Sequence, residues 1–362
     1  MKLKKLKKQS GIAQLLIPII ALLALLLFNL IRDPSFFSLG FATNNLGDTV
    51  LAGNLVSIFN NASELAILAM GMTLVTAACG GQDISVGAAA AIAGSVFIKV
   101  LKSGEITAWM VLIAFLLACV VAVIFGLFNG VLVAIFKIQP MIATLILFTM
   151  GRSIAYWING GATPTVTSPI IASIGGFIPG IPIPTPIFIV IGCALIIAQF
   201  LKFTNLGIYT QAVGINHHAA RLNGINTVGV KLLTFAILGL CVAVTGCMGV
   251  SRMGLINHST FLLEIEMDAI LAVAIGGNAL SGGKFRMIGS LLGAYAIQTL
   301  TTTLYAMEVP STDVKAYKAI VIIIIVLIGS PVFKEWIAKI NRRRKLRGMG
   351  AAQDVSAVSE GQ

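Results

Sequence analysis

Apolar runs separated by short polar, glycine-rich or proline-rich breaks occupy most of this chain. A helix needs about 20 apolar residues to cross the hydrocarbon core of a bilayer, and ten runs approach or exceed that length. They fall at residues 12–31, 62–79, 86–101, 108–136, 140–158, 187–201, 231–251, 264–278, 287–306 and 315–333. The pattern predicts an all-α, polytopic membrane protein of about ten transmembrane helices, with its transmembrane domain at 11–333.

Some of these runs are short or interrupted. Residues 86–101 and 187–201 are shorter than the usual crossing helix of about 17–25 residues. The run 62–79 gives way to a Gly-Gly-Gln-Asp break at 80–83 before apolar residues resume. Broken helices at membrane depth are tolerated where protein or a water-filled cavity satisfies the freed backbone groups. This feature favours a transport pathway over a simple anchor.

Two stretches of the chain resemble each other. Residues 79–94 and 275–293 both combine a glycine pair, a short polar break, another glycine and a run of small residues. This similarity fits a parallel internal repeat. Chance likeness between two glycine-rich turns is the alternative.

Composition supports a membrane protein. The 362 residues are 57% hydrophobic and only 10% charged, and the mean hydropathy is +0.98, whereas a soluble domain carries roughly a quarter charged residues. An ordinary soluble enzyme and a disordered protein are thereby excluded. The net charge of +12 is concentrated in the tails, at 2–8 and 334–347. Because no basic face with interleaved aromatics appears, we expect no nucleic-acid partner.

Basic residues also predict the topology. With alternating crossings, both tails and six loop residues fall on one side, which the positive-inside rule makes cytoplasmic. These six are Lys137, Lys202, Arg221, Lys231, Lys284 and Arg286. We expect an even number of spans, a basic cytoplasmic N-tail at 1–10, and a cytoplasmic C-tail at 334–362 that is basic and then disordered. The first run lacks a small-residue cleavage site and is expected to remain as a helix.

Catalytic and metal chemistry find no support in the residue pattern. The five cysteines lie in apolar stretches without CxxC spacing, and the adjacent His217 and His218 would point to different faces of a helix. Residues 277–285 approach a phosphate-binding loop, but Phe285 stands where that motif needs Ser or Thr. We expect no enzyme activity, metal site or bound cofactor in this chain.

The longest polar stretch among the expected cytoplasmic loops is 202–231. Asn216 is suited to cap a short helix there, Ala219 and Ala220 would give that helix a flat face, and Gly224 would end it. Such a helix suits the docking of another protein. A solvated connecting loop is the alternative.

This stretch carries the pattern A-V-G-x-N-x-x-A-A-x-x-x-G-I, which resembles the coupling segment of bacterial ATP-binding-cassette (ABC) importer permeases for monosaccharides, the ribose and galactofuranose type. Further blocks match that family in order, at 71–75 with 83–87, at 128–130, at 137–145 and at 266–283. Gln82, directly before Asp83, and the proline-rich loop 159–186 depart from the family pattern, which bears on the substrate rather than the class.

The resemblance implies one half of a transport machine in the bacterial inner membrane. A second permease copy or a paralogue would complete the pore, an extracytoplasmic sugar-binding protein would deliver a ribose-, galactose- or galactofuranose-like sugar, and membrane lipid would surround the assembly. A cytoplasmic ABC ATPase that holds ATP and Mg would dock on about 209–227 and drive alternating access. The residues implied in this coupling are Gly214, Asn216, Ala219, Ala220 and Gly224.

Polar residues in or beside the apolar runs are candidates for lining the translocation pathway, because ionisable groups inside a membrane are costly. The candidates are Asp83, Asn129, Glu266, Asp268 and Gln298. Asp83 is better suited to cap the helix that begins near Ser85 than to bind sugar. Glu266 and Asp268 would be exposed at a span's outer end, and the two amides would bond a sugar hydroxyl or another helix.

Two other classes of function are weighed against the importer. An ion-coupled secondary transporter of a small polar solute would want a buried relay of carboxylates, and the acidic residues here gather at the edges of the runs instead. A membrane-embedded enzyme or assembly scaffold would want clustered His or Asp ligands for its chemistry. The stretch 209–227 favours the ATPase-docked importer.

Overall fold

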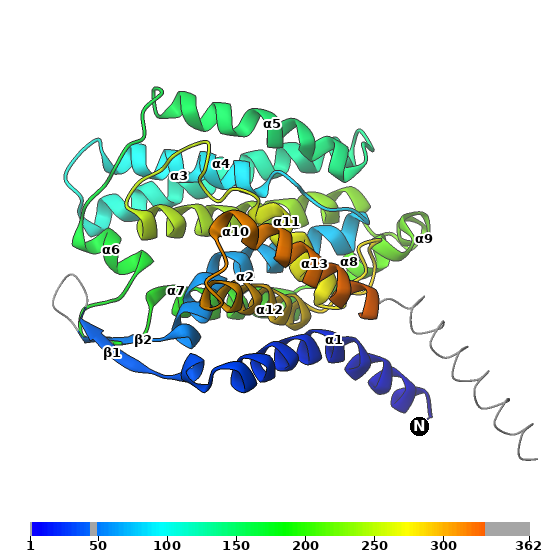
Figure 1. Ribbon diagram of the computed structural model, residues 1–362. Coiled ribbons are helices and arrows are strands. Elements are labelled where there is room, and N and C mark those ends of the chain that lie inside the picture. The colour runs from blue at the N-terminus through cyan, green and yellow to red at the C-terminus, as the bar shows by residue number, and fades with distance from the viewer. Residues whose placement is uncertain (1, 44–48, 330–362) are drawn as a thin grey trace, which may run out of the picture. The chain divides into compact units, whose positions relative to one another are not determined.

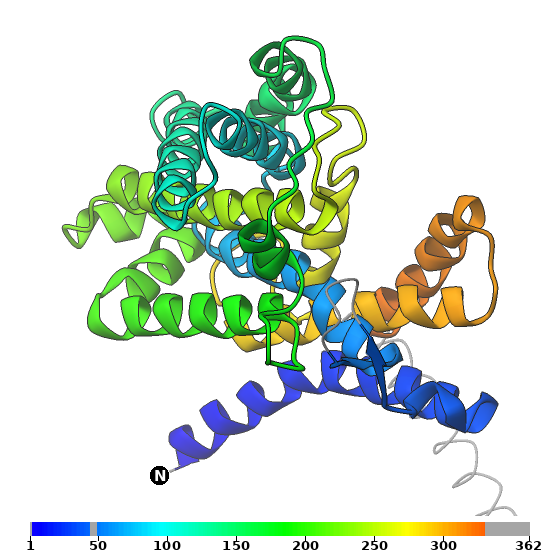
Figure 2. The ribbon, with the colours of Figure 1, turned by 90° about the vertical axis from the view of Figure 1, so that its left-hand side faces the viewer.

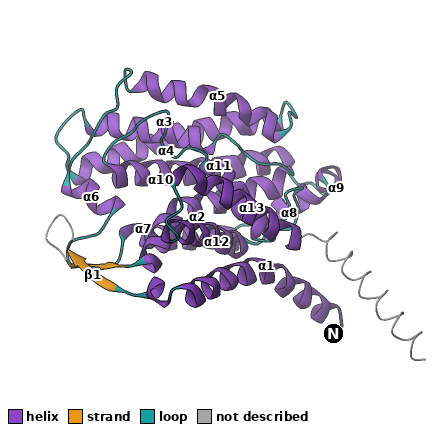
Figure 3. Ribbon diagram, viewed as in Figure 1, coloured by secondary structure: helices purple, strands orange, loops and turns teal. Residues whose placement is uncertain are grey.

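The computed structural model describes residues 2–43 and 49–329, and this part of the chain is almost entirely helical (Figure 3). Its helices are α1 (Lys2–Arg32), α2 (Asn54–Cys79), α3 (Val86–Leu101), α4 (Ala108–Ala134), α5 (Pro140–Ile158), α6 (Pro169–Gly175), α7 (Thr185–Phe203), α8 (Leu206–Ile215), α9 (His217–Leu222), α10 (Thr227–Met253), α11 (Ile265–Ile275), α12 (Met287–Ala306) and α13 (Ser311–Gly329). A short hairpin pairs β1 (Gly40–Thr43) with β2 (Thr49–Ala52). The C-tail predicted at 334–362 lies outside the described residues.

Six of the described helices are long and apolar enough to cross a membrane, namely Leu15–Arg32 within α1, and α2, α4, α5, α7 and α10. The predicted all-α, polytopic class is confirmed, while the total of ten crossings stays a prediction. The prediction of a short run at 187–201 was wrong: α7 has 19 residues. Its helix extends to Thr185 and Phe203, since the proline at 186 is well tolerated in a first turn.

The helix α2 is the core of the bundle. Within its apolar window 94% is buried, and it packs against α10, α12, α11, α7 and α8. The helices α3, α4 and α5 pack on one another, with α3 and α4 also against α10, while α1 packs on α12 (Figures 1 and 2). Small residues allow this close approach: a Cβ at Gly71 would lie 2.8 Å from Leu238 Cδ1 of α10.

The two glycine-rich breaks found in the sequence lie against each other. The first follows α2, which ends at Gly80 in the left-handed conformation, and the second, 276–286, joins α11 to α12. The Gly283 N–H donates to the Ala77 carbonyl at 2.9 Å, and Gln82 Nε2 donates to the Leu280 carbonyl at 3.1 Å. The similar stretches 79–94 and 275–293 therefore meet at one end of the bundle. The parallel repeat itself stays a prediction.

Candidate functional site

The predicted coupling segment forms two short helices, α8 and α9, separated at Asn216. This residue is extended (φ −156°), and its Oδ1 accepts a hydrogen bond from the Ala219 N–H at 3.0 Å, so that it caps α9. At the other end Asn223 follows α9, and Gly224 takes φ +79°, a conformation in which glycine is favoured. The local structure thus agrees with the predicted cap and terminator, while the coupling role of these residues stays a prediction.

The outward face of this segment differs from the prediction in one respect. Ala219 is exposed, but Ala220 is only 4% exposed and packs with Leu206, Val213 and Val230. Ala220 therefore holds α9 onto α8 and α10 instead of forming an outer face.

The exposed positions include two large apolar side chains. Leu222 is 90% exposed and Ile215 is 65% exposed, beside the contacting rings of His217 and His218. Slight burial, and then the positive charges of His218, Lys231, Lys137 and Arg221, lower the pKa of His217 below its ordinary value of 6.5. This face thus combines exposed apolar residues with the exposed Arg221 and His218. The sequence analysis expected small residues there and did not single out Leu222 or Ile215.

Gly214 lies at the contact between α8 and the two glycine-rich breaks. A Cβ built there would overlap the Ala77 carbonyl at the end of α2 and would lie 2.6 Å from the Gly283 nitrogen. We call Ala77, Gly214 and Gly283 the glycine junction. Backbone therefore meets backbone at this junction, with no side chain between α8, the end of α2 and the break 276–286. We call this end of the bundle the coupling end and the opposite end the distal end, where the β1–β2 hairpin lies in Figure 1.

Two of the candidate pathway residues, Asp83 and Asn129, lie in one buried network. Asp83 Oδ1 accepts hydrogen bonds from the Ser85 N–H at 2.8 Å and from Ser85 Oγ at 2.6 Å. Asn129 Nδ2 donates to Asp83 Oδ2 at 3.2 Å and to Ser85 Oγ at 2.9 Å. The cavity beside them is about 10 Å³, which is room for about one water molecule. The predicted cap at Asp83 is thus a turn before α3, which has no side-chain cap. The network ties this turn to α4 and leaves no space for a sugar.

The other three candidates lie elsewhere. Glu266 was predicted to lie exposed at the membrane interface, where an ionisable group has a low free-energy cost, but it is 1% exposed. A Cβ at Gly87 would overlap its Oε2. Within the described residues that oxygen has no hydrogen-bond partner. Asp268 is half-buried on the same helix. Gln298, on α12, makes a weak contact of 3.5 Å to Thr302. Among the described residues, no hydrogen bond joins Glu266 or Gln298 to Asp83 or Asn129.

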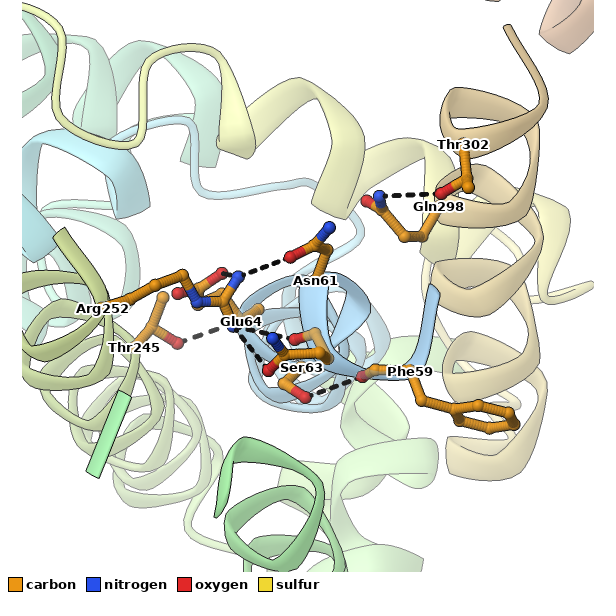
Figure 4. A network of polar contacts seen from close by, with 9 residues as sticks. Phe59, Asn61, Ser63, Glu64, Thr245, Arg252, Gln298 and Thr302 are labelled. Atoms are coloured by element: carbon orange, nitrogen blue, oxygen red, sulfur yellow. Dashed lines mark hydrogen bonds and ion pairs between the residues drawn. The ribbon is translucent and has the colours of Figure 1, made fainter. Parts of the chain in front are cut away.

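An ion pair that sequence reasoning missed lies near the distal ends of α2 and α10 (Figure 4). Arg252 Nη1 is 3.1 Å from Glu64 Oε2 and donates to Asn61 Oδ1 at 3.1 Å, while Nη2 donates to the Asn60 carbonyl at 2.8 Å. Glu64 falls inside an apolar run and Arg252 at the end of another, which was the available signal. The pairing of runs could not be read from one sequence.

This ion pair has polar and aromatic neighbours. In Figure 4 the side chain of Gln298 extends from α12 toward that of Asn61, and the rings of Phe59 and Tyr295 lie 5.2 Å apart between the same two helices. We call Asn60, Asn61, Glu64, Arg252 and Gln298 the distal polar cluster. Amides next to aromatic rings offer hydrogen bonds and an apolar surface together, which is a common combination in sites for small molecules.

Comparison with known proteins gives a consistent result. A family model described as the permease component of branched-chain amino acid transport systems matches residues 54–329. The chain is 36% identical to the galactofuranose transporter permease protein YtfT of Escherichia coli (strain K12), over 94% of this chain and 96% of that protein. It is 32% identical to the fructose import permease protein FruF of Bifidobacterium longum (92% of each). It is 35% identical to the ribose import permease protein RbsC of Haemophilus influenzae (85% of this chain, 90% of that protein). No solved structure matches.

Proposed function

Because the chain belongs to the family of permease components of branched-chain amino acid transport systems, we propose that it is the transmembrane subunit of an ABC importer that moves a monosaccharide into the cytoplasm. Its relatives are sugar import permeases, and the chain is a multi-pass membrane transport subunit rather than an enzyme. The finer elements of the proposal are the partner ATPase, the binding protein, a second permease subunit, the inner-membrane orientation, and a ribose-, galactose- or galactofuranose-like cargo.

The observation that carries the proposal is the construction of the coupling end. A transport subunit that hydrolyses no ATP itself needs an exposed surface on which the ATPase can bind. That surface must also be rigidly connected to the interior of the bundle. The helix α9 offers an exposed face with Leu222, and Gly214 connects α8 to the end of α2 by backbone contact. Movement of an ATPase bound to α9 would reach the buried core of the bundle through this connection, as rigid-body alternating access requires.

The distal polar cluster is the proposed entry for the sugar. The relatives are named for galactofuranose, fructose and ribose, all of them compact molecules rich in hydroxyl groups. Asn61 and Gln298 supply amide donors and acceptors between α2 and α12, beside the aromatic pair of Phe59 and Tyr295. The narrow cavity at Asp83 limits that residue to a structural role in this state of the pathway.

The coupling assignment is tested at the exposed face. Ala219→Trp and Leu222→Asp should abolish sugar uptake and reduce co-purification of the ATPase, while capture of sugar by the binding protein persists. Ala42→Trp, at an exposed alanine of the distal hairpin, is the matched control and should behave as wild type. Unimpaired uptake and normal ATPase co-purification in both test variants would contradict the proposal. Sugar accumulation in vesicles without any ATPase would instead support ion coupling.

A further inference from the structure

A polar pocket of about 390 Å³ lies between the distal ends of α3 and α5, away from the features described so far. It is lined by Lys99 in the last turn of α3, by Lys102 and Ser103 directly after that helix, by Asn159 at the end of α5 and by residues 162–165. Two lysines and several hydroxyl-bearing residues thus line one recess. Neither the coupling face nor the distal polar cluster includes any of these residues.

The pocket lies at the depth of lipid headgroups. Trp157, two residues before Asn159, is 84% exposed, and Trp109, at the start of α4, is 71% exposed. Exposed tryptophans are typical of the membrane–water interface. The helix α5 packs chiefly on α3 and α4, and only 28% of its apolar window is buried. The pocket therefore opens at the lipid-facing edge of the bundle.

The lining indicates which chemistry would fill the pocket. Lys99 and Lys102 attract a negative charge, and Ser103, Thr163 and Thr165 offer hydroxyl groups. Asn159 is 8% exposed; its Nδ2 donates to Ser95 Oγ at 2.9 Å, while its Oδ1 has no partner within the described residues. That oxygen has essentially no exposed surface, so a ligand in the pocket would meet the lysines and the hydroxyl groups instead. A ligand with an anionic group and nearby hydroxyl groups would complement this lining.

We propose that the pocket binds the headgroup of an anionic phospholipid of the phosphatidylglycerol type. In this proposal the phosphate binds to Lys99 and Lys102, and the glycerol hydroxyl groups bond to Thr163 and Thr165. This assignment also explains why two lysines stand at the end of the bundle opposite the coupling segment, where the positive-inside rule disfavours them. The exposed tryptophans at the same end of the bundle favour lipid over an acidic protein surface.

The test measures lipid binding to the purified full-length chain by native mass spectrometry. Phosphatidylglycerol and phosphatidylcholine with identical acyl chains are compared, and phosphatidylglycerol should be retained preferentially. Lys99→Gln with Lys102→Gln should weaken its binding about 30-fold, since each basic residue near a membrane surface contributes about a five-fold gain. Thr163→Glu, at an exposed position, should weaken it as well while leaving both lysines in place.

A matched double variant serves as the control, and two further outcomes would assign the pocket to another ligand. Lys202→Gln with Lys284→Gln removes the same charge at the coupling end and should leave phosphatidylglycerol binding unchanged. An equal loss in this control would show only a non-specific effect of charge and would overturn the site. Displacement of the lipid by millimolar inorganic phosphate would assign the pocket to a soluble anion instead. Normal lipid binding together with lost capture of the sugar-binding protein would make it a protein dock.

Discussion

At the scale of single residues, Gly214 gives the sharpest prediction. Gly214→Ala places a methyl group against the Ala77 carbonyl, whereas at Gly207 of the same helix the nearest atoms to an added Cβ are 3.7 Å away. Overpacking costs about 1–3 kcal/mol. We expect Gly214→Ala to lower the unfolding temperature of the detergent-solubilised protein and to abolish uptake, and Gly207→Ala to do neither. Equal behaviour of the two variants would show that α8 is not held by backbone contact.

The ion pair of Arg252 and Glu64 gives a second prediction at this scale. Arg252→Met leaves the Glu64 carboxylate without its cation and removes the bonds to Asn60 and Asn61. Removing one partner of a buried polar contact costs about 1–3 kcal/mol, and more where the group left behind is charged. Combined with Glu64→Gln the loss should be smaller than the sum of the two single changes. Thermal unfolding of the four proteins gives this coupling energy, and strict additivity would mean that the pair adds nothing to stability.

Individual residues were predicted best where the physics is local. The cap at Asn216 depends on the Ala219 N–H three residues further on, so sequence spacing was sufficient. The predicted cap at Asp83 was wrong, because Asp83 bonds to Ser85 in a turn that precedes α3, and no side chain caps that helix. The ion pair joins residues 64 and 252, and the burial of Glu266 depends on its contact with Gly87. A single sequence does not show which apolar runs pack against one another. Those pairings therefore required the structure.

At the scale of helices, two glycines near α7 are predicted to behave in opposite ways. Gly192 of α7 lines an apolar cavity of about 360 Å³ that includes Phe115 and Met248, and an added Cβ would meet nothing within 4 Å. Gly175 of α6 touches the backbone of Arg252, so that an added Cβ would overlap it. Gly192→Leu should leave the unfolding temperature unchanged or raised, and Gly175→Ala should lower it. A lower unfolding temperature for Gly192→Leu would mean that the cavity must stay open.

For helices, too, features set by neighbouring residues were predicted better than features set by distant contacts. The breaks after α2 and α11 were visible as glycine pairs, since glycine readily takes the left-handed conformation seen at Gly80 and Gly277. The prediction that Ala219 and Ala220 share one outer face was wrong for Ala220. A six-residue helix has two faces, and only its packing on Leu206 and Val230 decides which face is buried.

At the scale of the whole molecule, the apolar pattern gave the class of protein and left the packing open. Every predicted run contains a described helix, because burial in lipid requires long apolar segments with satisfied backbones. The sequence of α2 contains small residues, such as Gly71, Ala77 and Ala78, that are buried and fit its central position. Which helices surround it was decided by contacts between distant segments.

Topology gives the last prediction. Lys137 follows α4, Lys202 ends α7 and Lys284 lies in the break beside Ala77, so these basic residues gather at the coupling end. The positive-inside rule makes this end cytoplasmic. A reporter active only in the cytoplasm should therefore function when fused after Lys345 and should be silent near Thr165, which lies at the distal end. The reverse result would place α9 outside the cell, where no ATP-driven motor could reach it.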